Sequence, residues 1–380
     1  MRIGFEAKRA THNNRGLGNY SRGVIEGLLN HVPDIELFLY TPPVQNPIGV
    51  EWIKTLPANA HIKTPNSLFE KKVSSFWRSF LMANDLKKEN LDIFHGLSHE
   101  IPYRLDKLSF KKIVTMHDLI FMRYPDFFPL IDRLVYAQKF KYACKHSDKV
   151  IAICEQTRDD LVNYLGVDEK KIVVHYQSCS ENFYDKQSSE KIQKIKVKYN
   201  LDKPFILNVG AFEERKNQLM LLEAFSCVAH KIDEDLVFVG QGKKYKEQIE
   251  NRIDELKLKS RVHLLSSVTY EDLPSLYQGA SVFCFPSLFE GFGIPIIESL
   301  FSRTPVITSF GSCFPESAGP DSIFIDPHSI SSIGESLVSV LGDQNKQELM
   351  RNRGFDYVQR FHIKNTTAKL MDIYSQLTVN

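Results

Sequence analysis

Short apolar runs alternate with helical segments along almost the whole chain, and this alternation limits the possible folds more than any other feature of the sequence. In the first half, the predicted strands are Arg2–Ala7, Ile35–Tyr40, Leu91–His95, Ile113–His117, Val150–Ile153 and Ile172–His175. The predicted helices are Leu17–Leu29, Ser67–Lys88, Ile131–Cys144 and Thr157–Leu165. Such short apolar runs are typical of parallel strands covered on both faces. The pattern predicts a doubly wound α/β unit.

The same pattern starts again after a polar, lysine-rich stretch. Strands are predicted at 205–209, 236–240, 262–265, 282–285, 305–308 and 323–326, and helices at 218–228, 245–256, 271–278, 295–301 and from 330 onward. A single core rarely grows beyond about 250–300 residues. We therefore predict a Rossmann-like domain over 1–185, a linker over 186–203, a second Rossmann-like domain over 204–360 and a C-terminal helix over 361–380 that packs back toward the first domain.

Two similar α/β halves also predict where a ligand binds. In doubly wound folds, ligands bind outside the carboxyl ends of the strands. If the two carboxyl edges face each other, they form a cleft, and clefts are where small molecules usually bind. We therefore expect the functional site in a cleft between the two domains.

The segment Phe283–Leu300 is the most informative part of this expected site, because a strand, a tight turn and a helix follow one another. Gly291 and Gly293 allow backbone N–H groups to approach a ligand closely, and the helix N-terminus that follows favours an anion. Glu290 lies in the turn and Glu298 in the helix. Two carboxylates beside a glycine turn indicate a sugar and phosphate site. For Glu290 alone, a solvated residue at a helix start is the alternative.

The composition is that of an ordinary globular protein. Its net charge of +2 gives no general attraction to nucleic acid. The cysteines are scattered without a C-x-x-C pair, which is typical of free thiols in a reducing compartment. We find neither a signal-peptide pattern nor an apolar run long enough to span a membrane. We expect a cytoplasmic protein that has peripheral contact with the inner face of the cytoplasmic membrane.

Taken in order, the motifs resemble those of the retaining nucleotide-sugar glycosyltransferases of family 4. Glu290 and Glu298, with seven residues between them, match that family's signature. Further matching segments are 16–20, 116–119, 124–125, 152–157, 209–217, 238–240, 304–308, 315–316 and 324–327. The His-Asp-Leu, Tyr-Pro and Arg-Lys-Asn segments resemble the bacterial mannosyltransferase B-like subgroup. The resemblance covers nearly the whole chain and is weakest over 41–90.

This resemblance implies a GT-B fold, in which two Rossmann-like domains face each other across a cleft. The C-terminal domain would bind a GDP- or UDP-linked sugar, and the N-terminal domain would bind the acceptor. The implied reaction transfers mannose from GDP-mannose to a glycan or lipid-linked glycan in bacterial surface-polysaccharide biosynthesis, such as that of lipopolysaccharide, O-antigen or capsule. It implies no metal, no further cofactor and no nucleic-acid partner.

Arg215 and Lys216 follow a predicted strand and a short loop, so their cations can reach a diphosphate whose charge must be neutralised in the transition state. In the family, the lysine of this motif binds the diphosphate, often with an earlier arginine. Ala211 occupies the earlier place in this chain. Either Arg215 replaces that arginine, or one contact is missing. Without the surrounding motifs, a solvated surface pair would be the ordinary interpretation.

The resemblance assigns the remaining donor contacts. Glu298 would accept the two ribose hydroxyls, a task that suits the two oxygens of a carboxylate. Glu290 would accept a hydroxyl of the transferred sugar. The other donor-binding positions of the C-terminal domain are Val268 and the backbone amides around Phe292, Gly293 and Ile294.

The N-terminal domain is expected to complete the site. Gly16 and Gly18 would bring a loop against the diphosphate, although a turn before a helix is the simpler interpretation. His117 ends a predicted strand and would contact the sugar at the reacting centre, whereas a lone histidine at a strand end is more often structural. Asp118 either binds there or only caps the next turn.

Retention of configuration requires either an enzymic nucleophile or departure and attack on the same face. No carboxylate carries a motif that marks it as a nucleophile. The resemblance therefore implies a front-face path, in which the leaving phosphate is stabilised by cations and amides and accepts the proton of the incoming hydroxyl. The predicted catalytic residues are His117, Arg215, Lys216 and Glu290.

Two patterns that suggest a metal are set aside. Asp233-Glu-Asp235 matches the Asp-x-Asp of metal-dependent glycosyltransferases but precedes a strand as an ordinary turn. His95 and His99 lie in a segment that Gly96 and Ser98 mark as a loop, without the glutamate of a zinc helix.

Ser67–Lys88 is predicted as an amphipathic helix with an aromatic face, including Phe69, Phe76 and Trp77, and a basic face that includes Lys72. Such a helix packs on its own domain, or contacts an anionic membrane surface or a lipid-linked acceptor.

Two departures from the family pattern lie near the expected cleft. Cys154 stands where serine is common, and Gln177-Ser-Cys179 replaces the usual turn after the strand at 172–175. Three other activities remain open: a UDP-sugar-dependent transferase of the same family, a two-domain nucleotide-sugar epimerase, and a non-catalytic sugar-nucleotide binder.

Overall fold

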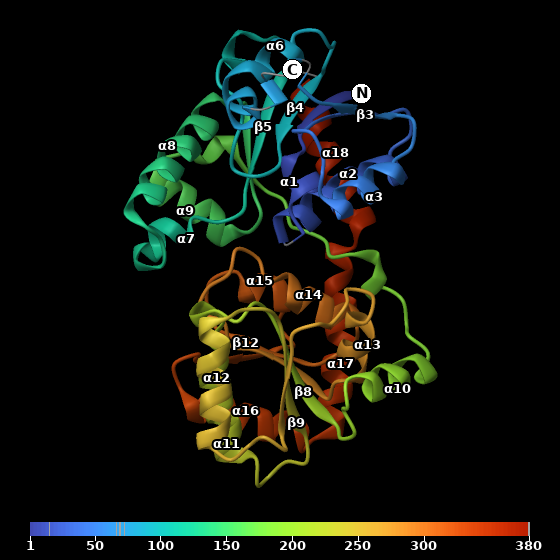
Figure 1. Ribbon diagram of the computed structural model, residues 1–380, viewed down its shortest axis with the longest axis vertical. Helices are drawn as coiled ribbons and strands as arrows, with labels where there is room; N and C mark the ends of the chain where they lie inside the picture. Colours follow the sequence, from blue (N-terminus) through green and yellow to red (C-terminus); the bar gives the residue numbers. More distant parts are fainter. Residues whose placement is uncertain (15, 66, 68–69, 72, 379–380) are drawn as a thin grey trace. The chain divides into compact units, whose positions relative to one another are not determined.

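The computed structural model describes residues 1–378 except 15, 66, 68–69 and 72 (Figure 1). The chain forms two compact units. Unit 1 comprises residues 1–179 and the chain from His362 onward, and unit 2 is Ser180–Phe361. Residues 186–203, predicted as a linker, lie in unit 2. Their helix α10 (Ser189–Lys198) packs against α13 (Leu273–Gly279).

Unit 1 is built on a parallel sheet. Over the described residues, its strands run in the order β3-β2-β1-β4-β5-β6-β7. They are β1 (Arg2–Glu6), β2 (Glu36–Tyr40), β3 (Ala60–Lys63), β4 (Ile93–Gly96), β5 (Lys111–Met116), β6 (Lys149–Ala152) and β7 (Ile172–Val174). The order reverses between β1 and β4, as in a doubly wound fold.

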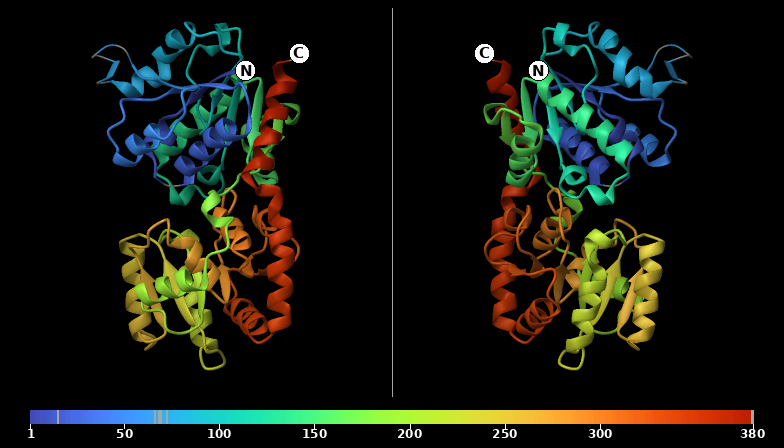
Figure 2. Two further views of the ribbon diagram at one scale, coloured as in Figure 1. Left: turned by 90° about the vertical axis from the view of Figure 1, so that its right-hand side faces the viewer. Right: turned by 90° about the vertical axis from the view of Figure 1, so that its left-hand side faces the viewer.

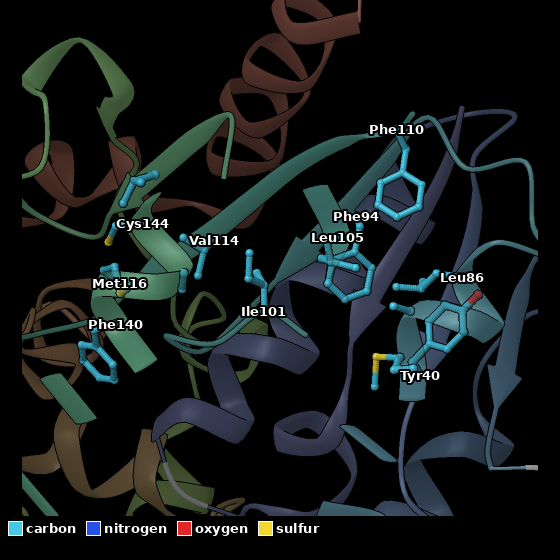
Figure 3. Packing of buried hydrophobic residues seen from close by; sticks show 14 of the residues in the cluster. Tyr40, Leu86, Phe94, Ile101, Leu105, Phe110, Val114, Met116, Phe140 and Cys144 are labelled. Carbon is cyan, nitrogen blue, oxygen red and sulfur yellow. The ribbon is translucent and has the colours of Figure 1, made fainter. Parts of the chain in front are cut away.

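Helices cover both faces of this sheet. They include α1 (Lys8–His12), α2 (Gly16–His31), α3 (Pro47–Lys54), α7 (Ile120–Arg123), α8 (Leu130–His146), α9 (Glu155–Leu165) and α18 (Ile363–Thr378). One core cluster joins sheet residues such as Phe94 and Met116 to Phe140 and Cys144 of α8 (Figure 3). A second cluster includes Ile3, Ile25 of α2 and Tyr374 of α18. The apolar strands are therefore buried on both faces, as the sequence predicts.

Unit 2 repeats this plan with a second parallel sheet. Over the described residues, its strand order is β10-β9-β8-β11-β12-β13. The strands are β8 (Phe205–Val209), β9 (Asp235–Val239), β10 (Val262–Leu265), β11 (Val282–Phe285), β12 (Val306–Ser309) and β13 (Ile323–Ile325). Besides α10, its helices include α11 (Gln218–Val228), α12 (Lys244–Glu255), α14 (Ile294–Phe301), α16 (Ile330–Leu341) and α17 (Gln344–Val358). The order reverses between β8 and β11, which places the loops after these two strands side by side.

The last helix of the chain belongs to the first unit. Figure 2 shows α18 running beside the sheet of unit 1. Tyr374 Oη lies 2.7 Å from His95 Nδ1, and His175 Nε2 donates to the Thr366 carbonyl at 2.8 Å. Gly27 of α2 allows the close approach, because a Cβ there would lie 2.4 Å from Thr367 Oγ1. The strands and helices of unit 1 therefore come from both ends of the sequence.

One predicted helix is confirmed only in part, over residues 74–86. Ser67–Lys88 is not a continuous amphipathic helix but contains α5 (Ser74–Phe76), a π-helical turn at Trp77–Leu81 and α6 (Met82–Leu86). Trp77 is fully buried, and its Nε1–H donates to Asp85 at 2.8 Å. Phe69 and Lys72 lie outside the described residues. Local packing of Trp77 thus takes precedence over the helical period of the sequence.

Helix α3 and strand β3 were not predicted, and neither were the short helices α1, α7 and α15 (Phe314–Ala318). In the part of the chain that the structure describes, no helix is both long and apolar enough to span a membrane.

Candidate functional site

In unit 2, the loops after β8 and β11 meet at the reversal of strand order. The first loop carries the short 3-10 turn Glu214–Lys216, and the second leads into α14. The Arg215 carbonyl accepts a hydrogen bond from the backbone N–H of Leu288 at 2.9 Å, and its oxygen lies 3.0 Å from Ser287 Oγ. These contacts bring the predicted residues Arg215, Lys216 and Glu290 together.

The Glu290 carboxylate is the centre of this arrangement. Its Oε1 accepts from Lys216 Nζ at 2.6 Å, from the Ser287 hydroxyl at 2.6 Å and from Arg215 NH1 at 2.9 Å. Burial by itself would raise the pKa of Glu290, but Lys216 and Arg215 lower it to about 2. Among the described residues, none donates to Oε2. Oε1 is thus held by the protein, and Oε2 keeps its capacity to accept a hydrogen bond.

The two cations differ in how much of their hydrogen-bonding capacity the protein uses. Arg215 NH1 also donates to the Phe289 carbonyl at 2.5 Å, and its NH2 lies 3.6 Å from Glu213. Arg215 therefore ties the two loops together. Lys216 Nζ donates to Glu290 and lies 5.2 Å from the centre of the Phe285 ring. An ammonium has three N–H donors, so Lys216 keeps the capacity to bind an anion.

The turn before α14 requires glycine. Gly293 has a φ of 89°, a conformation that side-chain-bearing residues rarely adopt. A Cβ at this position would also lie 3.1 Å from Ile296 Cδ1. The Phe292 side chain is buried and packs against Phe361 with ring centres 5.3 Å apart. At Phe292, only the backbone is therefore left to contact a ligand.

Glu298 is a buried carboxylate without a cationic partner among the described residues. It lies in α14, and its Oε2 accepts from the Tyr277 hydroxyl at 3.0 Å. Burial raises the pKa of Glu298 to about 7, although the Tyr277 hydrogen bond lowers it in part. Val268, also predicted in the donor set, is half-buried in the loop after β10.

His117 directly follows β5 in unit 1, and its contacts fix the imidazole tautomer. Its Nε2–H donates to the Leu97 carbonyl at 2.8 Å. Its Nδ1 accepts from Gln177 Nε2 at 3.1 Å. The Tyr20 ring meets the imidazole edge-on at 4.6 Å. Burial lowers the pKa of His117 to about 4, so the ring is neutral with both nitrogens engaged.

His117 also binds its neighbours through the backbone. Its carbonyl accepts from the Thr157 hydroxyl at 3.2 Å, and its N–H points to His99 Nδ1 at 3.5 Å. These contacts show a well-anchored residue at the carboxyl edge of unit 1. The catalytic assignment of His117 stays a prediction, and any contact through a ring nitrogen would have to displace Leu97 or Gln177.

Other predicted positions in unit 1 have local structural roles. Gly16 opens α2, and Gly18 lies inside it, where a Cβ would be 1.7 Å from the Asn13 carbonyl oxygen. Asp118 caps the next turn by accepting from the Ile120 N–H at 3.1 Å. Cys154 is the N-cap of α9, since its Sγ accepts from the Thr157 N–H at 3.3 Å. Cysteine performs at this position the task that serine usually has.

Three residues that support the site were not predicted. Ser287 holds Glu290, Tyr277 holds Glu298, and Gln177 holds His117. The family motif contains Ser287, and the altered turn at 177–179 pointed to Gln177, but neither pattern shows which side chain is bonded. Tyr277 lies 21 positions before its partner, so no local spacing could reveal that contact.

Two family descriptions match the chain on either side of the unit boundary. "Glycosyltransferase Family 4" matches residues 15–178, and "Glycosyl transferases group 1" matches residues 189–356. Together they account for most of the chain. The chain is a glycosyltransferase of family 4. This membership and the two parallel-sheet α/β units confirm the predicted family and the GT-B fold.

The chain is also similar in sequence to proteins that are named as mannosyltransferases. The chain is 26% identical over 289 residues to the O-antigen chain mannosyltransferase B of Escherichia coli, covering 75% of this chain and 74% of that protein. It is also 26% identical over 295 residues to the serotype-specific mannosyltransferase WbdA of Escherichia coli, covering 74% of this chain but only 36% of that protein. This family 4 chain therefore spans about a third of the longer relative.

Solved structures show the same fold. A glycosyltransferase from Rickettsia africae ESF-5 superposes with a TM-score of 0.78 at 19% identity, covering 100% of this chain and 99% of that one. Anabaena Alr3699/HepE in complex with UDP and glucose superposes with a TM-score of 0.76 at 15% identity, covering 99% and 100%.

Proposed function

We propose that this enzyme transfers mannose from GDP-mannose, with retention, to a glycan or lipid-linked glycan acceptor in surface-polysaccharide assembly. The observation that carries the proposal is the Glu290 carboxylate, which is anchored through Oε1 and open at Oε2 beside Lys216. A carboxylate held in this way can accept a sugar hydroxyl without moving. The choice of mannose is supported by the relatives named as O-antigen mannosyltransferases.

In this proposal, the residues of unit 2 divide the donor between them. The unused N–H groups of Lys216 and the amides of Phe292–Ile294 bind the diphosphate. Charge that develops on the leaving phosphate is stabilised there, which is where preorganised donors contribute most to catalysis. Glu298 accepts the ribose hydroxyls. Arg215 acts through position, since it holds the Phe289 carbonyl and Glu290 in place.

The proton of the incoming hydroxyl goes to the leaving phosphate on the same face of the sugar. His117 is not the proton acceptor in this scheme, because both ring nitrogens are hydrogen-bonded and burial lowers its pKa to about 4. In this proposal, His117 forms part of the acceptor-binding surface of unit 1, together with Gly16 and Gly18. Lys216 and the backbone amides carry the phosphate charge, so the proposed course uses no metal.

The base and sugar can be tested together. We would incubate the purified enzyme separately with GDP-mannose, UDP-glucose and UDP-N-acetylglucosamine and measure release of nucleoside diphosphate, with and without a lipid-extract acceptor. Lys216→Met and Glu290→Gln should reduce acceptor-stimulated release at least a hundredfold. Lys198→Met is the matched control, because Lys198 also pairs with a carboxylate of unit 2, Asp272 at 2.5 Å, but neither residue lies in the loops after β8 and β11.

Each outcome separates the alternatives. Release from GDP-mannose alone, stimulated by acceptor, supports the proposal. Release from a UDP sugar retains the transferase and rejects mannose, an outcome that the UDP complex of Anabaena Alr3699/HepE makes worth testing. Conversion of the donor sugar without acceptor indicates an epimerase. Tight binding of a donor without turnover indicates a binder.

A further inference from the structure

The first two turns of α8 present apolar side chains to solvent. Leu130 and Leu134 are each 63% exposed, Ile131 is 75% exposed and Val135 is 43% exposed. Phe127, just before the helix, is 43% exposed. Single exposed apolar residues are ordinary, but a contiguous group of this kind marks an interaction surface.

The orientation of α8 is fixed by its other face. Phe140, Ala143 and Cys144 are buried in the core cluster that lies against the sheet of unit 1 (Figure 3). Figure 1 shows α8 on the outer side of that unit. The helix therefore cannot turn its apolar residues inward without losing its core contacts.

The exposed face changes character along the helix. Gln138, Lys141 and Lys145 continue from Leu134 at helical spacing, and all three are exposed. At 1.5 Å per residue, Lys141 lies about 10 Å further along the axis than Leu134. Asp132 is exposed too, but helical spacing places it away from this face. The face thus consists of an apolar tip followed by cations.

This order matches the profile of an anionic bilayer surface, where hydrocarbon lies below a layer of phosphate groups. Interfacial helices bury apolar side chains about 5–10 Å into that boundary and place lysine among the head groups. Each lysine near an anionic surface adds to the electrostatic attraction. We propose that the α8 face formed by Leu130, Ile131, Leu134, Val135, Lys141 and Lys145 docks on an anionic membrane surface.

A second copy of the chain fits this face less well. Two α8 helices packed in parallel would place lysines against lysines. Packed antiparallel, they would place the lysines of one helix on the apolar tip of the other. A membrane satisfies both parts of the face at once. The inference rests on the proposed function in one respect, namely that the acceptor is lipid-linked. Since α8 is in the connection that follows β5, its start lies on the same edge of the sheet as His117.

Vesicle flotation tests the proposal without donor or acceptor. The full chain is mixed with vesicles of phosphatidylcholine alone, or of phosphatidylcholine and phosphatidylglycerol in equal parts. Wild-type protein should float with the mixed vesicles, and Ile131→Glu/Leu134→Glu should reduce the bound fraction at least tenfold. Lys141→Glu/Lys145→Glu should reduce it at low salt.

Helix α10 supplies matched controls. Val197 is 62% exposed there, and Lys191 and Lys194 are exposed on the same helix. Val197→Glu and Lys191→Glu/Lys194→Glu should float as the wild type does. The proposal would be overturned if the α8 variants floated as well as the wild type. It would also be overturned if the α10 variants lost as much vesicle binding as the α8 variants. Concentration-dependent dimers that the Ile131→Glu/Leu134→Glu change abolishes, without vesicle binding, would instead assign the face to a second copy.

The same variants separate this proposal from the proposed function. Donor binding measured with GDP-mannose alone should be unchanged in Ile131→Glu/Leu134→Glu, because the donor residues lie in unit 2. Vesicle binding by a protein that turns over no donor would retain the docking surface and reject the transferase proposal. The Ile131→Glu/Leu134→Glu variant should also transfer less sugar to a lipid-linked acceptor in vesicles. If its transfer rate equals that of the wild type, docking through α8 does not promote use of a lipid-linked acceptor.

Discussion

Lys216 and Glu290 form a 2.6 Å ion pair that joins the loops after β8 and β11, the two strands at which the order of the second sheet reverses. Both side chains are 12% exposed. Removing one partner of such a pair leaves the other charge buried, which is costly. The pair therefore fixes the geometry of the site before any ligand arrives.

The first prediction concerns the charge of Glu290. Its pKa in the folded protein is about 2, below its usual 4.5, so its stabilising contribution is present above pH 4.5 and is lost as the pH falls through 2. Glu290→Gln should lower the free energy of unfolding by about 3 kcal/mol at pH 7 and by less than half of that at pH 3. Urea denaturation followed by circular dichroism measures both values. An equal difference at the two pH values would show that the ion pair contributes nothing through charge.

The second prediction concerns Glu298 and binding. Its pKa in the folded protein is about 7, so the carboxylate that would accept ribose hydroxyls forms only as the pH rises through 7. Affinity for GDP should increase roughly tenfold between pH 6 and pH 8. Calorimetric titration measures it, and Glu298→Gln is the control for ionisation of the phosphate itself. A variant with the same pH dependence as the wild type would remove Glu298 from the ribose site.

Glu298 also makes a prediction for stability. Its pKa is raised on folding, so its contribution is fully present below about pH 4.5 and is lost as the pH rises through 7. Glu298→Gln should therefore be more stable than the wild type at pH 8 by about 3 kcal/mol, and much less so at pH 5. Thermal unfolding at the two pH values checks this. A variant that is less stable at pH 8 would contradict it.

The third prediction concerns buried histidines in unit 1. Burial lowers the pKa of His95 to about 3 and of His117 to about 4. Their contribution to stability is present above pH 6.5 and is lost as the pH falls toward 4. Each of the two histidines should lower the free energy of unfolding by about 2 kcal/mol as the pH falls from 7 to 5. Trp52 and Trp77 are the two tryptophans of the chain and both lie in unit 1, so their fluorescence follows the unfolding of this unit.

The matched comparison uses one buried and one exposed histidine. His117→Gln should reduce the loss of stability between pH 7 and pH 5 by about 2 kcal/mol. His31→Gln is the exposed control, because His31 is exposed at the end of α2. The same loss of stability in both variants would mean that other groups cause it.

The fourth prediction concerns the cap of α9. Cys154→Ala should lower the stability of unit 1 by about 1 kcal/mol, because the Thr157 N–H loses its acceptor. Cys154→Ser should keep that bond and restore the stability. Tryptophan fluorescence in urea measures both variants. Equal effects of serine and alanine would show that the thiol contributes through packing and not through the cap.

Much of the fold could be predicted from the sequence, since buried parallel strands are short, apolar and separated by helices. Four elements, β8, α11, β10 and β11, have the predicted bounds. The errors have physical causes. β3 pairs at the sheet edge, and no residue of Ala60–Lys63 is fully buried, so it lacks the apolar run of an inner strand. Trp77 is pulled into the core, which breaks the predicted helical period.

The site was predictable in its residue types but not in its bonds. Glu290, Lys216 and Arg215 are brought together as the motifs suggested. Which oxygen of Glu290 is anchored depends on Ser287, and the tautomer of His117 depends on Leu97 and Gln177. Three-dimensional packing determines these hydrogen-bond partners, and they cannot be inferred from residue spacing in the sequence. The cleft between the two units stays a prediction.

The return of α18 to unit 1 has a consequence for biosynthesis. A ribosome completes the whole of unit 2 before it makes Thr366 and Tyr374, the partners of His175 and His95. Domains usually fold in the order in which they emerge. Here unit 2 is one continuous segment and is complete when Phe361 has been made. Unit 1 begins earlier but is complete only when α18 has been made. A chain that ended at Phe361 would therefore hold every segment of unit 2 but an incomplete unit 1.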